Sequence, residues 1–237
     1  MGLMRDFSNV IWMTGAPGSK WSAASWVLSE IPELKVDKGD RTPERLLQHD
    51  TRWGNVRHTG VYFGPGNELG KNFHNINTIS KDEIFDEIIQ AWPVWDRDMT
   101  YIIRCHQFIY NIDWMIDTFP ESKFCIVTRP PEACYAGWTS VGGPNTPYPH
   151  YKEFYKNEEY GKKKLKEEVF LARKAIYEYG LDTHIASLGH FKNKWSLNPL
   201  PDTPLDNHIK HLEGYRWDSK DPLMGLKHDV TISYLNF

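Results

Sequence analysis

Apolar residues in this chain gather in short runs that are separated by longer amphipathic stretches. Short apolar runs of this kind are typical of strands buried in a parallel sheet. The expected strands are residues 9–14, 100–105, 123–128 and 182–187. The expected helices are residues 20–30, 43–49, 80–92, 109–119, 132–140 and 151–179, the last with a break near Gly161.

This alternation of strands and helices indicates the fold class. Parallel strands joined by helices require right-handed crossovers, which bring the strands into one sheet. We therefore expect a single α/β domain over residues 1–237. Loops rich in Gly and Pro are expected over residues 57–70 and 141–149, and an irregular tail that wraps the domain is expected from about residue 190.

Composition and charge narrow the function classes. The formal net charge is −3 without a basic stripe, which argues against a dedicated nucleic-acid-binding protein. The cysteines Cys105, Cys125 and Cys134 are odd in number and lack metal-ligand spacing, so we expect a reduced, cytoplasmic protein without a metal. No apolar run could span a bilayer, and no membrane association is expected. The charged run 162–168 is interpreted as a solvated helix face.

The turn after residues 9–14 has the features of a phosphate-binding loop. Its two glycines permit tight geometry, and the helix that follows offers free N–H groups and its positive dipole end to an anion. The spacing does not satisfy a Walker A motif, and an ordinary Gly-rich turn is the alternative. The candidate residues are Gly15, Ala16, Pro17, Gly18, Ser19, Lys20, Trp21 and Ser22.

Two further candidates follow other predicted strands. His106 comes directly after residues 100–105, and an imidazole there suits a general base, although a structural histidine is the alternative. Arg129 follows residues 123–128, where a guanidinium can clamp a phosphate, the alternative being a pair with a carboxylate. Because ligands bind beyond the carboxyl ends of parallel strands, we expect the turn, His106 and Arg129 to lie together.

Three segments of the chain resemble the sulfotransferase family, whose donor is 3′-phosphoadenosine 5′-phosphosulfate. Residues 14–22 (TGAPGSKWS) are similar to the family's loop for the 5′-phosphosulfate. Residues 102–108 (IIRCHQF) are similar to the strand-end motif that supplies the catalytic histidine in the cytosolic branch. Residues 119–138 (FPESKFCIVTRPPEACYAGW) are similar to the 3′-phosphate-binding segment, with Arg129 at the arginine position.

The resemblance implies a P-loop-type three-layer α/β/α fold with a central, mainly parallel sheet, and transfer of a sulfuryl group to a hydroxyl of a small molecule or a glycan. It makes His106 the general base, because Trp26 stands where some relatives have a glutamate base. Lys20 and Arg104 would stabilise the transferred group. Gly137 stands where a serine helps to hold the 3′-phosphate, so Thr139 or Ser140 would substitute for it.

Two other functions remain open. A P-loop nucleotide kinase could share the GAPGS sequence of the turn, but it needs a strand-end carboxylate for Mg²⁺ where this chain has His106 and Arg129. A non-catalytic nucleotide-binding module is the third reading. Residues 60–70 and 141–149 are candidates for acceptor contacts, and His58 and His74 are the next candidates for the base. The acceptor and the oligomeric state stay open.

Overall fold

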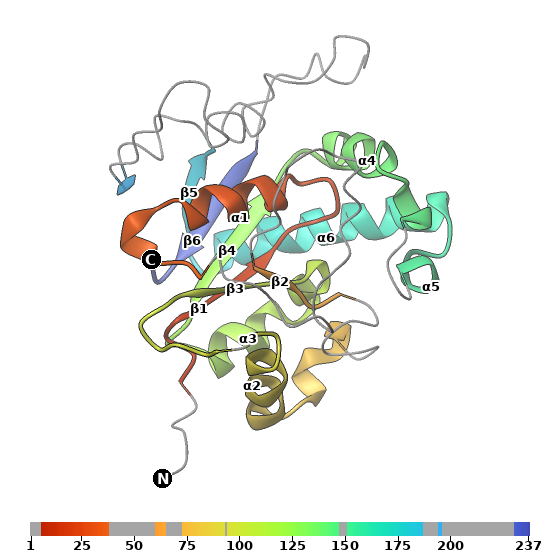
Figure 1. Cartoon of the computed structure of the whole chain (residues 1–237). Helices are drawn as coiled ribbons and strands as arrows, with labels where there is room; N and C mark the ends of the chain where they lie inside the picture. The colour runs from red at the N-terminus through yellow and green to blue at the C-terminus, as the bar shows by residue number, and fades with distance from the viewer. Residues whose placement is uncertain are drawn as a thin grey trace.

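The computed structural model describes residues 6–37, 60–64, 73–92, 94–146, 151–186, 194–195 and 230–237. Within these residues the chain forms an α/β fold with one open, mixed sheet of six strands (Figure 1). The strands are β1 (Val10–Thr14), β2 (Val61–Tyr62), β3 (Tyr101–Arg104), β4 (Lys123–Thr128), β5 (Asp182–Ile185) and β6 (Thr231–Leu235). Their order in the sheet is β2-β3-β1-β4-β6-β5.

Helices connect the strands largely as the sequence pattern predicts. The α-helices are α1 (Trp21–Ser29), α2 (Lys81–Ile89), α3 (Ile112–Thr118), α4 (Pro131–Thr139), α5 (Tyr151–Tyr155) and α6 (Glu158–Glu178). Short 3-10 helices are η1 (Pro32–Leu34), η4 (Phe73–Thr78), η5 (His106–Asn111) and η6 (Gly143–Asn145). The predicted helix over 109–119 is therefore divided into η5 and α3, and the predicted helix over 43–49 lies outside the described residues.

The pairing of the strands determines where a ligand can bind. β1 pairs in parallel with β3 on one side and with β4 on the other, and β2 pairs in parallel with β3. The chain therefore leaves β1 toward one side of the sheet, reaches β3, and returns past β1 to β4. The connections diverge at β1, and the crevice beyond the carboxyl end of such a strand is the usual ligand site of an open α/β sheet.

Alternating residues of β1 supply two hydrophobic cores. Val10 and Trp12 belong to the core on the face covered by α2, α3 and α6. Ile11 and Met13 belong to the core on the opposite face, which packs against α1. Because β1 is buried on both faces, its near-continuous apolar sequence is explained. Each fully buried large apolar side chain of this kind contributes about 1.5–3 kcal/mol to stability.

The end of the chain differs from the expected irregular tail. Residues Thr231–Leu235 form β6, which pairs antiparallel with both β4 and β5. Ile232 and Tyr234 are buried in the core that contains α1, and the Ser233 hydroxyl lies 3.0 Å from the Thr183 hydroxyl on the other face. The expectation of an irregular tail is wrong at these residues. Apolar and polar residues alternate here over only five positions, which is too short a pattern to predict a strand before its two neighbouring strands are known. The short strand β2 likewise lies within the expected loop 57–70.

The long helix predicted over 151–179 is interrupted at a different residue. Lys156 has a left-handed backbone with φ 56°, and Asn157 caps α6 by accepting a hydrogen bond of 2.9 Å from the Tyr160 N–H. Gly161, the expected break, lies inside α6. A Cβ on Gly161 would lie 2.3 Å from Cη2 of Trp138, so this glycine allows the helix to approach a buried tryptophan.

Substitution of Gly161 by alanine tests this contact. Helix propensity alone predicts stabilisation by about 1 kcal/mol. The Trp138 indole is held by a 2.8 Å hydrogen bond to the Tyr151 hydroxyl and cannot easily retreat. We expect overpacking against Trp138 to outweigh the gain in helix propensity. Gly161→Ala should therefore lower the free energy of unfolding by about 1–3 kcal/mol in urea denaturation. Lys163→Ala, at an exposed position of α6, is the control and should change it little. Stabilisation by Gly161→Ala would contradict the contact.

Candidate functional site

Three connections meet at the carboxyl edge of β1, β3 and β4. The loop of residues 15–20 follows β1, η5 follows β3, and α4 follows β4. The Thr14 hydroxyl donates a 3.1 Å hydrogen bond to the carbonyl of His106, and Nη1 of Arg129 donates a 3.1 Å hydrogen bond to the carbonyl of Gly18. The structure therefore brings together the turn, His106 and Arg129, as the sequence analysis expects.

The loop is folded tightly against β4 and α4. The Ser19 N–H donates to the Ala16 carbonyl at 3.0 Å, which closes the turn. Gly18 has φ 79°, and a Cβ there would lie 2.0 Å from the carbonyl oxygen of Cys134 in α4. Lys20 also has a left-handed backbone, with φ 73°, and α1 begins directly after it without a side-chain cap. The first-turn N–H groups of α1 are consequently not capped by a side chain, as an anion-binding helix terminus requires.

Lys20 and Arg129 place two basic groups in a poorly hydrated environment. Burial, together with the nearby Arg129 charge, lowers the pKa of the Lys20 ammonium to about 6. Burial also lowers the pKa of the Arg129 guanidinium from its ordinary value. A bound anion would offset the unfavourable interaction between these two groups. The electrostatics of this pair of basic groups therefore favour a negatively charged ligand.

Two buried polar atoms at the loop have no hydrogen-bond partner within the described part of the chain. They are Nε of Arg129 and Oγ of Ser19, and the two residues are 7% and 0% exposed. Leaving such an atom unpaired costs about 1–3 kcal/mol, more for a charged group. Unpaired donors that persist at the same loop are expected where a ligand supplies the acceptors.

The Trp21 ring contacts two candidate residues, Arg104 of β3 and His106 of η5. The guanidinium of Arg104 lies over the Trp21 ring at 5.5 Å from the centroid, and its Nη1 lies 3.4 Å from the Ser22 hydroxyl. The His106 ring stacks on the Trp21 ring, and the two ring centroids are 3.9 Å apart. Tyr62 meets the His106 ring edge-on at 5.9 Å, so the described part of segment 60–70 reaches the histidine.

His106 is held in one tautomer. Its Nδ1 lies 2.5 Å from the carbonyl oxygen of Gly15, which can only accept, so Nδ1 carries the proton and Nε2 keeps its lone pair. Burial, with a contribution from the Arg104 charge, lowers the pKa of His106 to about 3. The imidazole is thus neutral at physiological pH and able to accept a proton at Nε2. A negative ligand beside it would raise this pKa.

Gly137 lies at the site, where the resemblance leads us to expect a hydroxyl from Thr139 or Ser140. A Cβ on Gly137 would lie 3.3 Å from the Gly18 carbonyl and 3.7 Å from Nη1 of Arg129. The Ser140 hydroxyl donates to the Gly137 carbonyl, and the Thr139 hydroxyl donates to carbonyls of the preceding turn. Both hydroxyls are therefore engaged within α4 itself. The described part of segment 141–149 packs against α4, α5 and α6.

A series of hydrogen-bonded polar side chains begins at Gln107, next to His106, and was not predicted from the sequence. Gln107 donates from Nε2 to the Tyr155 hydroxyl at 3.0 Å, and that hydroxyl donates to Oε1 of Glu168 at 3.0 Å. Glu168 is fully buried, and burial raises its pKa to about 8. The interpretation of residues 162–168 as a solvated face is therefore wrong at Glu168. The available signal was its spacing from Leu165 and Ala172, which puts it on the apolar stripe of α6.

Other expectations concern thiols, metals and histidines. Cys105, Cys125 and Cys134 are buried and form no disulfide, and burial raises the pKa of Cys134 to about 12. Among the described residues, no group of three or more potential metal ligands is found. His58 and the side chain of His74 lie outside the described part of the chain.

Comparisons of the chain with protein-family models, with curated protein sequences and with solved structures found no match. None of the helices in the described residues combines the length and the apolar character needed to cross a membrane.

The lowered pKa of Lys20 predicts that anion binding depends on pH. The charged ammonium binds an anion better, and it is the minor form above pH 6. The affinity for adenosine 3′,5′-bisphosphate should therefore fall as pH rises above 6, by up to about tenfold per unit, with proton uptake on binding. Calorimetry in buffers of different ionisation enthalpy measures both effects.

The matched control for this prediction is Lys20→Arg, because a guanidinium stays charged across this pH range. Titration of the ligand's own phosphates affects both proteins equally. The pH slope should be smaller for Lys20→Arg than for the native protein. The same slope in both proteins would show that another group takes up the proton.

Proposed function

We propose that this protein is a sulfotransferase that moves a sulfuryl group from 3′-phosphoadenosine 5′-phosphosulfate to a hydroxyl of a small molecule or glycan. The observation that carries the proposal is the convergence of the loop, Lys20, Arg129 and a neutral His106 at the carboxyl edge of the sheet. The unpaired polar atoms of Ser19 and Arg129 support an anionic ligand at this edge.

The finer fold assignment is part of the same proposal. A P-loop-type three-layer α/β/α architecture with a mainly parallel sheet is supported by α1 on one face and α2, α3 and α6 on the other. It is also supported by the parallel pairing of β1 with both β3 and β4, because this pairing puts the loop at the central strand.

The proposed reaction is a direct in-line displacement at sulfur. The acceptor oxygen attacks the sulfur atom while Nε2 of His106 takes the hydroxyl proton. The bond between sulfur and the bridging oxygen of the 5′-phosphate breaks, and its electrons stay on the leaving adenosine 3′,5′-bisphosphate. General-base catalysis of this type contributes about 10²–10⁴ in rate.

Basic groups have two roles in this proposal. Lys20 and the uncapped N–H groups of α1 stabilise the charge that develops on the leaving oxygen, and Arg104 contributes through its position over Trp21. Arg129 donates hydrogen bonds to the 3′-phosphate from its guanidinium, whose Nε has no partner among the described residues, and so positions the donor. Proton uptake by Lys20 on donor binding would couple donor recognition to charge stabilisation.

A comparison of nucleotides tests this function. Adenosine 3′,5′-bisphosphate should bind more tightly than ATP, with no need for Mg²⁺, when both are measured by calorimetry. Arg129→Ala should weaken the bisphosphate by about 1.5–3 kcal/mol, as for a charge-assisted hydrogen bond, and adenosine 5′-phosphate much less. Equal losses for both ligands would show that Arg129 only shapes the loop through Gly18. Tight, Mg²⁺-dependent binding of ATP would favour a nucleotide kinase instead.

His106→Asn tests the proposed base. Asparagine can still donate a hydrogen bond to the Gly15 carbonyl, but it cannot take the acceptor proton. Bisphosphate binding should survive, while turnover falls by about two to four orders of magnitude. The assay follows transfer of labelled sulfate to a panel of phenols, alcohols and glycans. Near-native turnover of the variant would show that His106 is not the base. If the native protein binds the bisphosphate but sulfates no acceptor, a non-catalytic nucleotide-binding module is favoured instead.

A further inference from the structure

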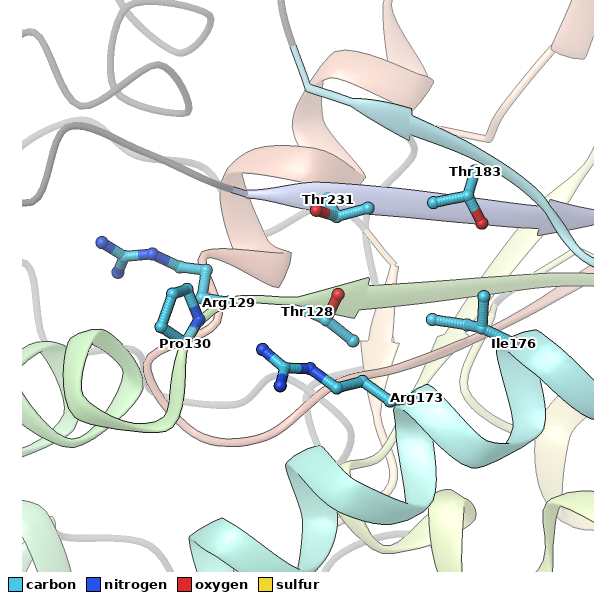
Figure 2. A pocket seen from close by; sticks show the side chains of 7 residues that line it. All are labelled: Thr128, Arg129, Pro130, Arg173, Ile176, Thr183 and Thr231. Atoms are coloured by element: carbon cyan, nitrogen blue, oxygen red, sulfur yellow. The ribbon is translucent and has the colours of Figure 1, made fainter.

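A pocket lies on the other side of β4 from the loop. Its volume is about 340 Å³, and Figure 2 shows it where β4 ends and β6 begins. Seven residues line it: Thr128, Arg129, Pro130, Arg173, Ile176, Thr183 and Thr231. None of these seven described residues is acidic.

The strand alternation separates this pocket from the proposed donor site. Thr128 follows Ile126 by two residues and therefore faces the core that contains α6. Thr231 is paired in register with Thr128, so it faces the same side. Arg129, the next residue, turns its side chain to the loop, where Nη1 contacts Gly18. Figure 2 shows the Arg129 guanidinium directed away from the three threonines.

Arg173 supplies the positive charge of the pocket. It extends from α6 toward Thr128 and Pro130 (Figure 2). Within the described residues it has neither an ion pair nor a hydrogen bond, whereas the neighbouring Lys174 pairs with Glu178 at 3.5 Å. A guanidinium has five donors, and one without a partner among the described residues is suited to an oxyanion.

The hydroxyl of Thr128 is the second observation that points to a ligand. Thr128 is 7% exposed and lines the pocket, and its hydroxyl makes no hydrogen bond with the described residues. A hydroxyl that borders a pocket without a partner in the described residues can donate a hydrogen bond to a bound ligand or accept one from it. Thr183 differs, because its hydroxyl already contacts the Leu181 carbonyl and the Ser233 hydroxyl, each at 3.0 Å.

The start of α4 adds to this environment. Pro130 is the residue before this nine-residue helix, and no side chain caps it. The positive end of the helix dipole therefore lies at the pocket wall beside Thr128 and Arg173.

We propose that this pocket binds the phosphate group of a small organic molecule through the Arg173 guanidinium and the hydroxyls of Thr128 and Thr231. The volume is in the range of small-molecule sites and leaves room for more than a bare ion. Arg129 also lines the pocket, but its guanidinium is directed to the loop, so the phosphate contacts proposed here come from other residues than those proposed for the donor nucleotide.

The test measures binding of glycerol 3-phosphate and of inorganic phosphate to the full chain at constant ionic strength. Arg173→Gln should weaken glycerol 3-phosphate by about tenfold or more, as expected for loss of a charge-assisted hydrogen bond. Lys166→Gln removes the same charge from an exposed position of α6 and should leave the affinity unchanged. Thr128→Val should weaken binding severalfold, and Thr128→Ser should retain it.

Tighter binding of glycerol 3-phosphate than of inorganic phosphate supports an organic ligand, and equal binding supports the oxyanion site with free phosphate as its ligand. Three results overturn the proposal. The first is no binding beyond that of chloride. The second is equal affinity of the Arg173→Gln and Lys166→Gln variants. The third is loss of binding with Arg129→Ala but not with Arg173→Gln, because the phosphate would then sit at the loop.

Discussion

The candidate site depends on one close contact, between the backbone of the 15–20 loop and the backbone of β4 and α4. Gly15 and Gly18 lie so close to this segment that a Cβ on them would fall 2.4 Å from the Val127 carbonyl and 2.0 Å from the Cys134 carbonyl. Arg129 reinforces the contact with its hydrogen bond to Gly18. This close packing and the Arg129 hydrogen bond favour one arrangement of the loop backbone and of Lys20 in the free protein.

This preorganisation has an electrostatic consequence. Holding Lys20 beside Arg129 in a poorly hydrated place disfavours the ammonium and lowers its pKa to about 6. The same burial keeps His106 neutral, with its proton on Nδ1. The unfavourable interactions are present in the free protein and are relieved by an anion. Such fixed charges and dipoles are most effective where a reaction develops negative charge, because no reorganisation is needed at that moment.

Helix α6 connects the candidate site with the rest of the domain. Its buried face supplies Glu168, which accepts from Tyr155, and Tyr155 in turn accepts from Gln107 next to His106. The same helix also supplies Arg173 to the pocket on the other side of β4. Hydrogen bonds between buried polar groups make a core specific as well as stable, since few alternative packings pair the same groups. The position of η5 therefore depends on a residue of a distant helix.

The local sequence determined the central strands and the strand-end residues of the candidate site. The tertiary structure decided the remaining features. The runs at 9–14, 100–105 and 123–128 predict β1, β3 and β4, because burial on both faces demands continuous apolar residues. The same reasoning finds the strand-end positions of His106 and Arg129. It could not find β6 or the pairing of Thr128 with Thr231. Each of these depends on which distant segments pack together, and a short stretch of sequence carries no information about its partners until the chain has folded.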